Sequence, residues 1–217
     1  MCKGKSRRAW SVICACLMIT LMAPLGLANN DDAEEGYRID ASGQWLYDLE
    51  GGSSKIIMFV GKEPVDALSI PRELGGYPVT SIDDYAISFF DNDTTAHYTA
   101  TRLTIPDTVI SIGDYAFIGC ESITNITIPD SVTSIGIAPF PMHLPHIHVS
   151  PDNPAYEDRD GVLFDKRNNA LVSYPGAREG AYAIPEDTLS IGYAAFEECS
   201  EAEQYAKRLG IAHVFRD

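Results

Sequence analysis

The chain has 217 residues, of which 45% are hydrophobic and 22% are charged, and its formal net charge is −15. This balance is typical of a folded globular protein and excludes a wholly disordered chain. The excess of acid repels nucleic acids and anionic membrane surfaces, so neither is expected as a partner.

The first 28 residues have the pattern of a secretory signal peptide. Four basic residues and no acid precede an uncharged apolar stretch over 9–28, and Gly26 and Ala28 are small residues placed for cleavage after Ala28. An uncleaved membrane anchor is the alternative, because the stretch approaches the roughly 20 residues that span a bilayer. Without residues 1–28 the chain keeps 12 basic and 31 acidic residues, a net charge of −19. We therefore expect a secreted, extracellular protein, with retention at the cell surface left open.

The segment before the repeats is predicted to form a cap. Residues 29–43 are polar and are expected to be loose, whereas two apolar runs at 44–50 and 55–60 flank Gly51 and Gly52. Two such runs around a Gly-Gly turn predict a β-hairpin, so residues 44–65 are interpreted as an N-terminal hairpin cap.

Residues 66–199 contain a repeat. Ile105 and Ile128 are 23 residues apart, as are Phe117 and Phe140, and both pairs belong to segments with the same order of residue types. A third copy lies at 182–196 and a degraded one at 68–87. Self-similarity at this period predicts a solenoid, in which stacked coils bury the apolar edges that a single coil exposes.

Each slot of the repeat has a physical interpretation. Leu-x-Ile alternates with the period of a strand and should add to a parallel sheet, and the following Pro ends that strand. Val-x-x-Ile supplies a second apolar contact on the other side of the coil. The Gly after it is expected to allow a bend with positive φ. The Ala-Phe that closes the coil should bring each ring onto the equivalent ring of the next coil.

The pattern resembles the BspA-type (Treponema pallidum type) leucine-rich repeats, with their L-x-I-P…V-x-x-I-G-x-x-A-F-x-x-C order. The likeness covers about residues 65–200. It implies a cell-surface or secreted bacterial protein that takes part in adhesion and partner binding. The fold class expected is a β-rich repeat solenoid (α+β), a short leucine-rich-repeat array with a parallel sheet and a cap at each end.

Two further segments complete the expected architecture. The period breaks at about 150–180, where two strand-like runs surround Lys166–Asn169; this insertion is interpreted as the enlargement of one coil. Residues 200–217 are interpreted as a C-terminal cap, a helix from the N-cap Ser200 to Gly210 followed by a short strand over 211–215.

Two cysteines, Cys120 and Cys199, remain after the signal peptide, each three residues after a closing Phe. They belong to coils that are not neighbours. At the spacing of stacked strands they should lie beyond the roughly 7 Å Cα separation that a disulfide allows, so two buried thiols are expected.

The sequence offers weak candidates for metal binding and none for catalysis. His146 and His148 point to the same side of a strand and form half of a zinc or copper site, but a third ligand is lacking, and His143 is expected to point elsewhere. The acids between Asp152 and Asp160 do not match a calcium loop. No hydrolase, metalloprotease or nucleotide-binding motif is present. We expect no cofactor, no metal and no enzymatic activity.

The residues between the core positions of the strands are the candidate binding site. They should share the outer face of the parallel sheet, which solenoids use for recognition: Ser69, Arg102, Thr104, Asn125, Thr127, His146 and His148. The expected partner of the monomeric chain is a protein or a surface glycan.

The sequence also allows other interpretations. The acidic loops, including Asp91–Asp93, are an alternative contact for a basic partner. An accessory domain with a carbohydrate-binding or hydrolytic role would need paired carboxylates in a cleft. A spacer for surface display is a third reading.

Overall fold

A computed structural model describes residues 36–61, 66–88, 100–178 and 182–196. The chain divides into a unit of residues Met1–Gly36 and a unit of residues Tyr37–Asp217, and all fifteen assigned strands belong to the second. The signal-peptide prediction, the loop at 91–93, Cys199 and the C-terminal cap lie outside the described residues. The helix expected at 200–210 is therefore not part of the described fold, which in these ranges consists of strands and turns. No helix in the described ranges is long and apolar enough to cross a membrane.

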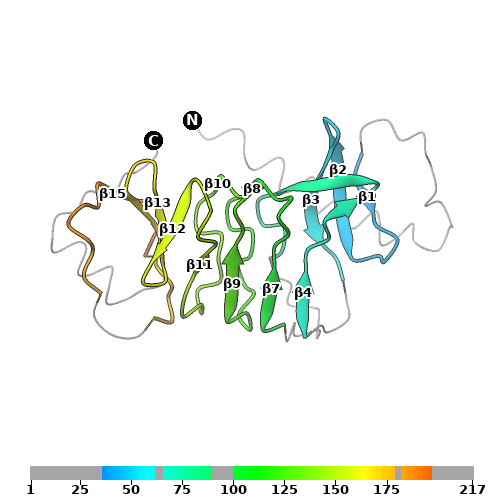
Figure 1. The fold of residues 1–217 in the computed structure, drawn as a ribbon. Coiled ribbons are helices and arrows are strands. Elements are labelled where there is room, and N and C mark those ends of the chain that lie inside the picture. The colour runs from blue at the N-terminus through cyan, green and yellow to red at the C-terminus, as the bar shows by residue number, and fades with distance from the viewer. Residues whose placement is uncertain (1–35, 62–65, 89–99, 179–181, 197–217) are drawn as a thin grey trace, which may run out of the picture. The chain divides into compact units, whose positions relative to one another are not determined.

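The first sheet is built from the Leu-x-Ile runs. Its strands are β4 (Ala67–Ser69), β7 (Arg102–Thr104), β9 (Asn125–Ile128) and β11 (His148–Val149). They lie side by side in the order β11-β9-β7-β4, all parallel, as Figure 1 shows. Along β7 and β9 the exposure alternates residue by residue, so the predicted strands and their parallel pairing are confirmed.

The Val-x-x-Ile slots form a second sheet, which the sequence analysis predicted only as an apolar contact. Its parallel members are β3 (Ser53–Phe59), β6 (Tyr77–Ile82), β8 (Ser111–Ile112) and β10 (Ser134–Ile135). The short β5 (Glu73–Leu74) pairs antiparallel with β6. Each of the regular coils thus adds one strand to each sheet.

Side chains from both sheets make one hydrophobic core. Leu103 and Ile126 of the first sheet and Ile112 of the second belong to the same buried cluster. The rings of Phe117 and Phe140 stack with centroids 6.3 Å apart and an interplanar angle of 13°, as expected for equivalent rings of neighbouring coils. Burying each such ring stabilises the stack by about 2–3 kcal/mol.

The glycine slot has a different role from the one expected. Gly113 and Gly136 do not have positive φ. Instead, a Cβ on Gly113 would lie 2.6 Å from the backbone nitrogen of Asp84, and a Cβ on Gly136 would lie 2.6 Å from that of Asp114. The prediction of a positive-φ glycine is therefore wrong, because the slot needs a small residue where the preceding coil approaches most closely.

The left-handed residue of each coil comes two positions after this slot. It has φ between 41° and 58° and is never glycine: Tyr85, Tyr115, Ala138 and Ala194. The rings of Tyr85 and Tyr115 stack at 5.2 Å. Ring stacking on the neighbouring coil offsets part of the cost of this conformation, about 1–2 kcal/mol for a residue with a Cβ.

The N-terminal hairpin is present. β2 (Trp45–Glu50) pairs antiparallel with β3, and the turn consists of Gly51 and Gly52, both with positive φ. β3 then joins β6 in parallel, so the hairpin covers the first coil of the second sheet. The segment expected to be loose is ordered where it is described, because β1 (Arg38–Ile39) pairs with β2 and backbone N–H groups of residues 42, 44 and 45 donate to the Asp40 carboxylate.

The insertion folds as an antiparallel meander. Its strands are β12 (Tyr156–Arg159), β13 (Val162–Asp165) and β14 (Ala170–Ser173), and β14 pairs in parallel with β15 (Ser190–Ile191) of the last repeat. The turn before β12 is hydrogen-bonded to the preceding coil. There the amide of the buried Asn153 donates to the carbonyls of Pro129 and Val132. The insertion thus contributes β14 as the strand that pairs with β15 of the last repeat.

Candidate binding face

The register of the first sheet brings the candidate residues into two rows. Arg102 pairs with Asn125, and the alignment of β9 with β11 places His146 beyond Asn125. In the other row Ser69 pairs with Thr104, and Thr127 pairs with His148. All seven candidate residues are exposed, while the strand residues between them are buried. We call this surface of β4, β7, β9 and β11, completed by Ala67, the sheet face (Figure 1).

Apart from Ala67, the side chains of the sheet face are polar, and all of these carry groups that can donate hydrogen bonds. The rings of His146 and His148 lie with centroids 6.1 Å apart. Within the described residues no group of three or more His, Cys, Asp or Glu side chains is arranged to hold a metal ion. His143 is exposed, unlike the buried Cys120 to which its place in the repeat corresponds.

The insertion covers the outer edge of the sheet at β11. The Val149 N–H donates to Oδ1 of Asp158 at 3.0 Å, and the Ile147 N–H donates to the carbonyl of Gly161 at 2.9 Å. A Cβ on Gly161 would lie 2.6 Å from Nδ1 of His146, so the hairpin tip packs directly beside that ring. These contacts satisfy backbone groups of an edge that would otherwise attract another strand, and no pattern in the sequence predicted them.

A second group of side chains covers the edge of β10. The hydroxyl of Tyr156 accepts the Ile135 N–H at 3.0 Å, and Nη1 of Arg167 donates to the carbonyl of Thr133 at 3.1 Å. Arg167 is held by the carboxylate of Asp165 at 2.6 Å. Burial raises the pKa of Tyr156, and the neighbouring charge of Arg167 offsets this rise only in part. The phenol therefore stays neutral at physiological pH and remains an acceptor for β10.

The acids of the insertion are engaged with separate partners. Glu157 pairs with Arg159, Asp158 accepts from the backbone of β11, and Asp160 pairs with Arg178. They do not converge on one point, which is the opposite of what a calcium site needs.

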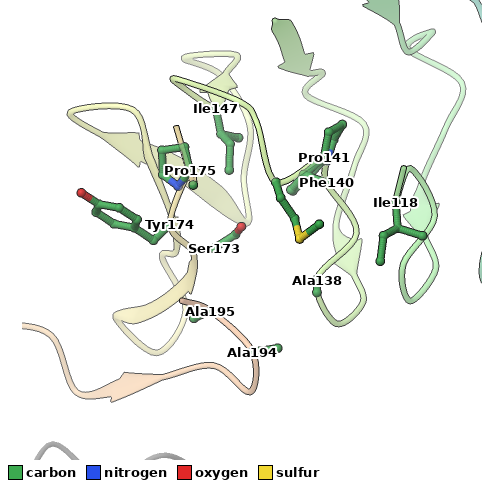
Figure 2. A pocket seen from close by; sticks show the side chains of 12 residues that line it. Ile118, Ala138, Phe140, Pro141, Ile147, Ser173, Tyr174, Pro175, Ala194 and Ala195 are labelled. Carbon is green, nitrogen blue, oxygen red and sulfur yellow. The ribbon is translucent and has the colours of Figure 1, made fainter. Parts of the chain in front are cut away.

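A pocket lies where the second sheet is interrupted between β10 and β14. Its volume is about 30 Å³, and Figure 2 shows Phe140 and Ile118 on one side and Tyr174, Ser173 and Ala195 on the other. Its lining contains no Asp, Glu or His. The paired carboxylates that a glycoside hydrolase would need are absent from this pocket.

Cys120 is a buried free thiol, as predicted. Its Sγ lies 3.1 Å from the carbonyl of Ile87, and burial raises its pKa far above the ordinary thiol value. Such a thiol is a packing group and not a nucleophile at neutral pH.

Two parallel sheets built from a 23-residue repeat define a leucine-rich-repeat solenoid. Residues 80–144 match the family described as "BspA type Leucine rich repeat region (6 copies)". Over these residues the resemblance to BspA-type leucine-rich repeats seen in the sequence is confirmed. No curated protein matches the chain.

Several solved structures of bacterial proteins are similar to this chain. A leucine rich cell surface protein from Faecalibacterium prausnitzii A2-165 is 21% identical with a TM-score of 0.44, over 78% of this chain and 69% of that one. The T. pallidum Leucine Rich Repeat protein (TpLRR) is 16% identical with a TM-score of 0.36, over 82% and 99%. The pneumococcal vaccine antigen PcpA is 17% identical with a TM-score of 0.37, over 74% of this chain and 62% of its own length.

Proposed function

We propose that the chain is a secreted or surface-associated bacterial interaction protein that binds another protein through the sheet face. The observation that carries the proposal is the arrangement of this face: two rows of exposed polar side chains on four parallel strands whose alternate residues are anchored in the core. A rigid sheet holds such side chains in a fixed pattern at little cost in conformational entropy.

Three further points support the proposal. The repeats belong to a type found in bacterial cell-surface proteins, and one structural relative is described as a cell surface protein. The insertion closes the outer edge of the sheet at β11, so a partner cannot add a strand there. A partner at this end of the sheet would be recognised by the exposed side chains of the sheet face. The pocket between β10 and β14 has no Asp, Glu or His in its lining, and the proposal assigns it no reaction.

The test is a capture experiment with host and bacterial surface components. Arg102, Asn125, His146 and His148 are changed together to alanine, and a control variant carries Ile110→Ala and Ser134→Ala at exposed positions of the second sheet. The sheet-face variant should lose a protein that the unchanged chain and the control both capture. Equal capture by all three proteins rejects the sheet face as the binding site.

A further inference from the structure

Arg102 differs from the other basic side chains between β2 and β15. The others in the described ranges are each paired with a carboxylate or a backbone carbonyl: Lys55 with Asp83, Arg72 with Asp107, Arg159 with Glu157 and Asp187, Lys166 with the carbonyl of Asn153, Arg167 with Asp165 and Arg178 with Asp160. Within the described residues, Arg102 has neither an ion pair nor a side-chain hydrogen bond. In a chain of net charge −15, no carboxylate of the described residues lies within ion-pair distance of its guanidinium.

The surroundings of Arg102 are also unusual in charge. None of the eight exposed positions of the sheet face is Asp or Glu, although the chain has 31 of them. In the row Arg102–Asn125–His146, the guanidinium is on β7, the amide is on β9 and the imidazole lies just before β11, on chain segments about 4.8 Å apart. Such a row of donors is complementary to carboxylate oxygens, and arginine suits them especially because it can donate two parallel hydrogen bonds.

The size of the face limits the kind of partner. β4 and β7 have three residues each, β9 has four and β11 has two. At about 3.3 Å per residue and about 4.8 Å between strands, these lengths give a footprint of roughly 200 Å². A standard interface between globular proteins buries about 800 Å² on each side. The face also lacks a Phe, Tyr or Trp residue, and so offers no broad apolar surface for a sugar ring. These properties favour an extended peptide segment.

We propose that the sheet face binds an extended acidic peptide segment of the partner protein, with a carboxylate of that segment paired with Arg102. This inference rests on the proposed function and specifies the chemistry of the partner. The net negative charge of the chain repels such a ligand at long range. At physiological ionic strength this repulsion is screened beyond about 8 Å. At shorter range the hydrogen-bond donors of the sheet face determine the interaction.

The test measures binding of labelled peptides to the purified protein by fluorescence anisotropy in 0.15 M salt. The probes are ten-residue peptides of alternating Glu and Ser, with Gln/Ser and Lys/Ser peptides of the same length as controls. We expect the Glu peptide to bind about tenfold more tightly than either control. Arg102→Gln should remove that preference. Arg72→Gln, which changes an exposed arginine already paired with Asp107, should alter binding less than about twofold.

Equal binding of the Glu and Gln peptides, or an equal effect of the two arginine substitutions, overturns the inference. A second outcome would also overturn the inference: the protein binds oligogalacturonate through Arg102 but does not bind the Glu peptide. The ligand would then be an acidic glycan and not a peptide. Thr127→Trp separates this failure from that of the proposed function, because a bulky ring in the centre of the face blocks any ligand. A surface protein lost with Thr127→Trp but retained with Arg102→Gln keeps the proposed function and rejects the acidic segment. If neither substitution affects capture, both proposals fail.

Discussion

The glycine slot and the left-handed slot show how neighbouring coils restrict single residues. Gly113 is needed for close approach, and Asp83 takes the same slot in the first coil because its neighbour there is the cap strand β3. Asp83 uses the available space to pair with Lys55 at 2.8 Å. The same slot thus accepts a side chain only next to the cap.

Gly113→Ala should lower the free energy of unfolding by about 1–3 kcal/mol, because the new methyl group would lie 2.6 Å from backbone atoms of the preceding coil. The control is Gly192→Ala, where the nearest atom is the carbonyl oxygen of Leu171 at 3.3 Å. Urea unfolding followed by circular dichroism measures both. An equal loss in the two variants contradicts the close-approach explanation.

Ala194→Gly should stabilise the protein by up to about 1 kcal/mol, since Ala194 has a φ of 58° and glycine adopts this conformation without the clash of a Cβ. Ala195→Gly is the matched control, because this buried neighbour does not have positive φ and should be destabilised. The difference in the midpoint of thermal unfolding tests the assignment. A destabilised Ala194→Gly variant would show that no strain is present.

At the scale of elements, the insertion completes both sheets at the points where repeat pairing stops. β11 is covered by Asp158 and Gly161, and β10 is covered by Tyr156 and Arg167. In both cases the contacts satisfy backbone groups that would otherwise be an open sheet edge. The insertion is therefore an internal edge cover as well as a source of one more strand.

Tyr156→Phe should accelerate hydrogen exchange at the Ile135 amide by about tenfold, because the phenol oxygen that accepts its N–H is removed. The Gly136 amide, which donates to the carbonyl of Ile112, should keep its protection. Exchange measured by NMR distinguishes the two. Unchanged protection of Ile135 would mean that Tyr156 does not hold the edge of β10.

The Asp165–Arg167 pair makes this edge sensitive to acid. Burial alone would raise the pKa of Asp165, but hydrogen bonds from the side chain and backbone of Arg167, together with its charge, bring that pKa below the ordinary 3.8. A lowered folded-state pKa stabilises the protein above the ordinary value, and this contribution is lost as the pH falls below it.

Asp165→Asn should therefore be less stable than the unchanged protein at pH 7, with the difference in free energy of unfolding shrinking between about pH 5 and pH 2. Unfolding by urea at a series of pH values measures it. A difference that is independent of pH would show that the charge of Asp165 makes no contribution.

At the scale of the whole molecule, the repetitive part could be predicted and the exceptions to the repeat could not. Alternation over residues 102–105 and 125–128 gives strands, their parallel order and the exposed residues, because the contacts are set by a period of 23. The bond between Ile135 and Tyr156 joins residues 21 apart through a side chain, and no periodic pattern indicates such a contact. Likewise, Tyr115 carries no sequence signal for a left-handed conformation, which a glycine or asparagine would have given.

The same difference applies to the candidate site. The positions of the sheet face follow from alternation, so all seven residues were predictable as exposed neighbours. The unpaired state of Arg102 was not predictable, because it depends on which acids lie near each base in three dimensions. The proposal of an acidic partner therefore rests on the structure and not on the sequence pattern.

The most direct test of the sheet face is site-specific photo-crosslinking within a single coil. Thr127 on the sheet face and Ser134 on the second sheet are both exposed, so a small aliphatic diazirine amino acid at either position keeps the core intact and adds no ring that would block the face. With host and bacterial surface components, the protein carrying the probe at position 127 should form a discrete crosslinked species, and the one carrying it at 134 should not. Crosslinking at 134 and none at 127 would contradict the assignment of the sheet face as the interaction surface.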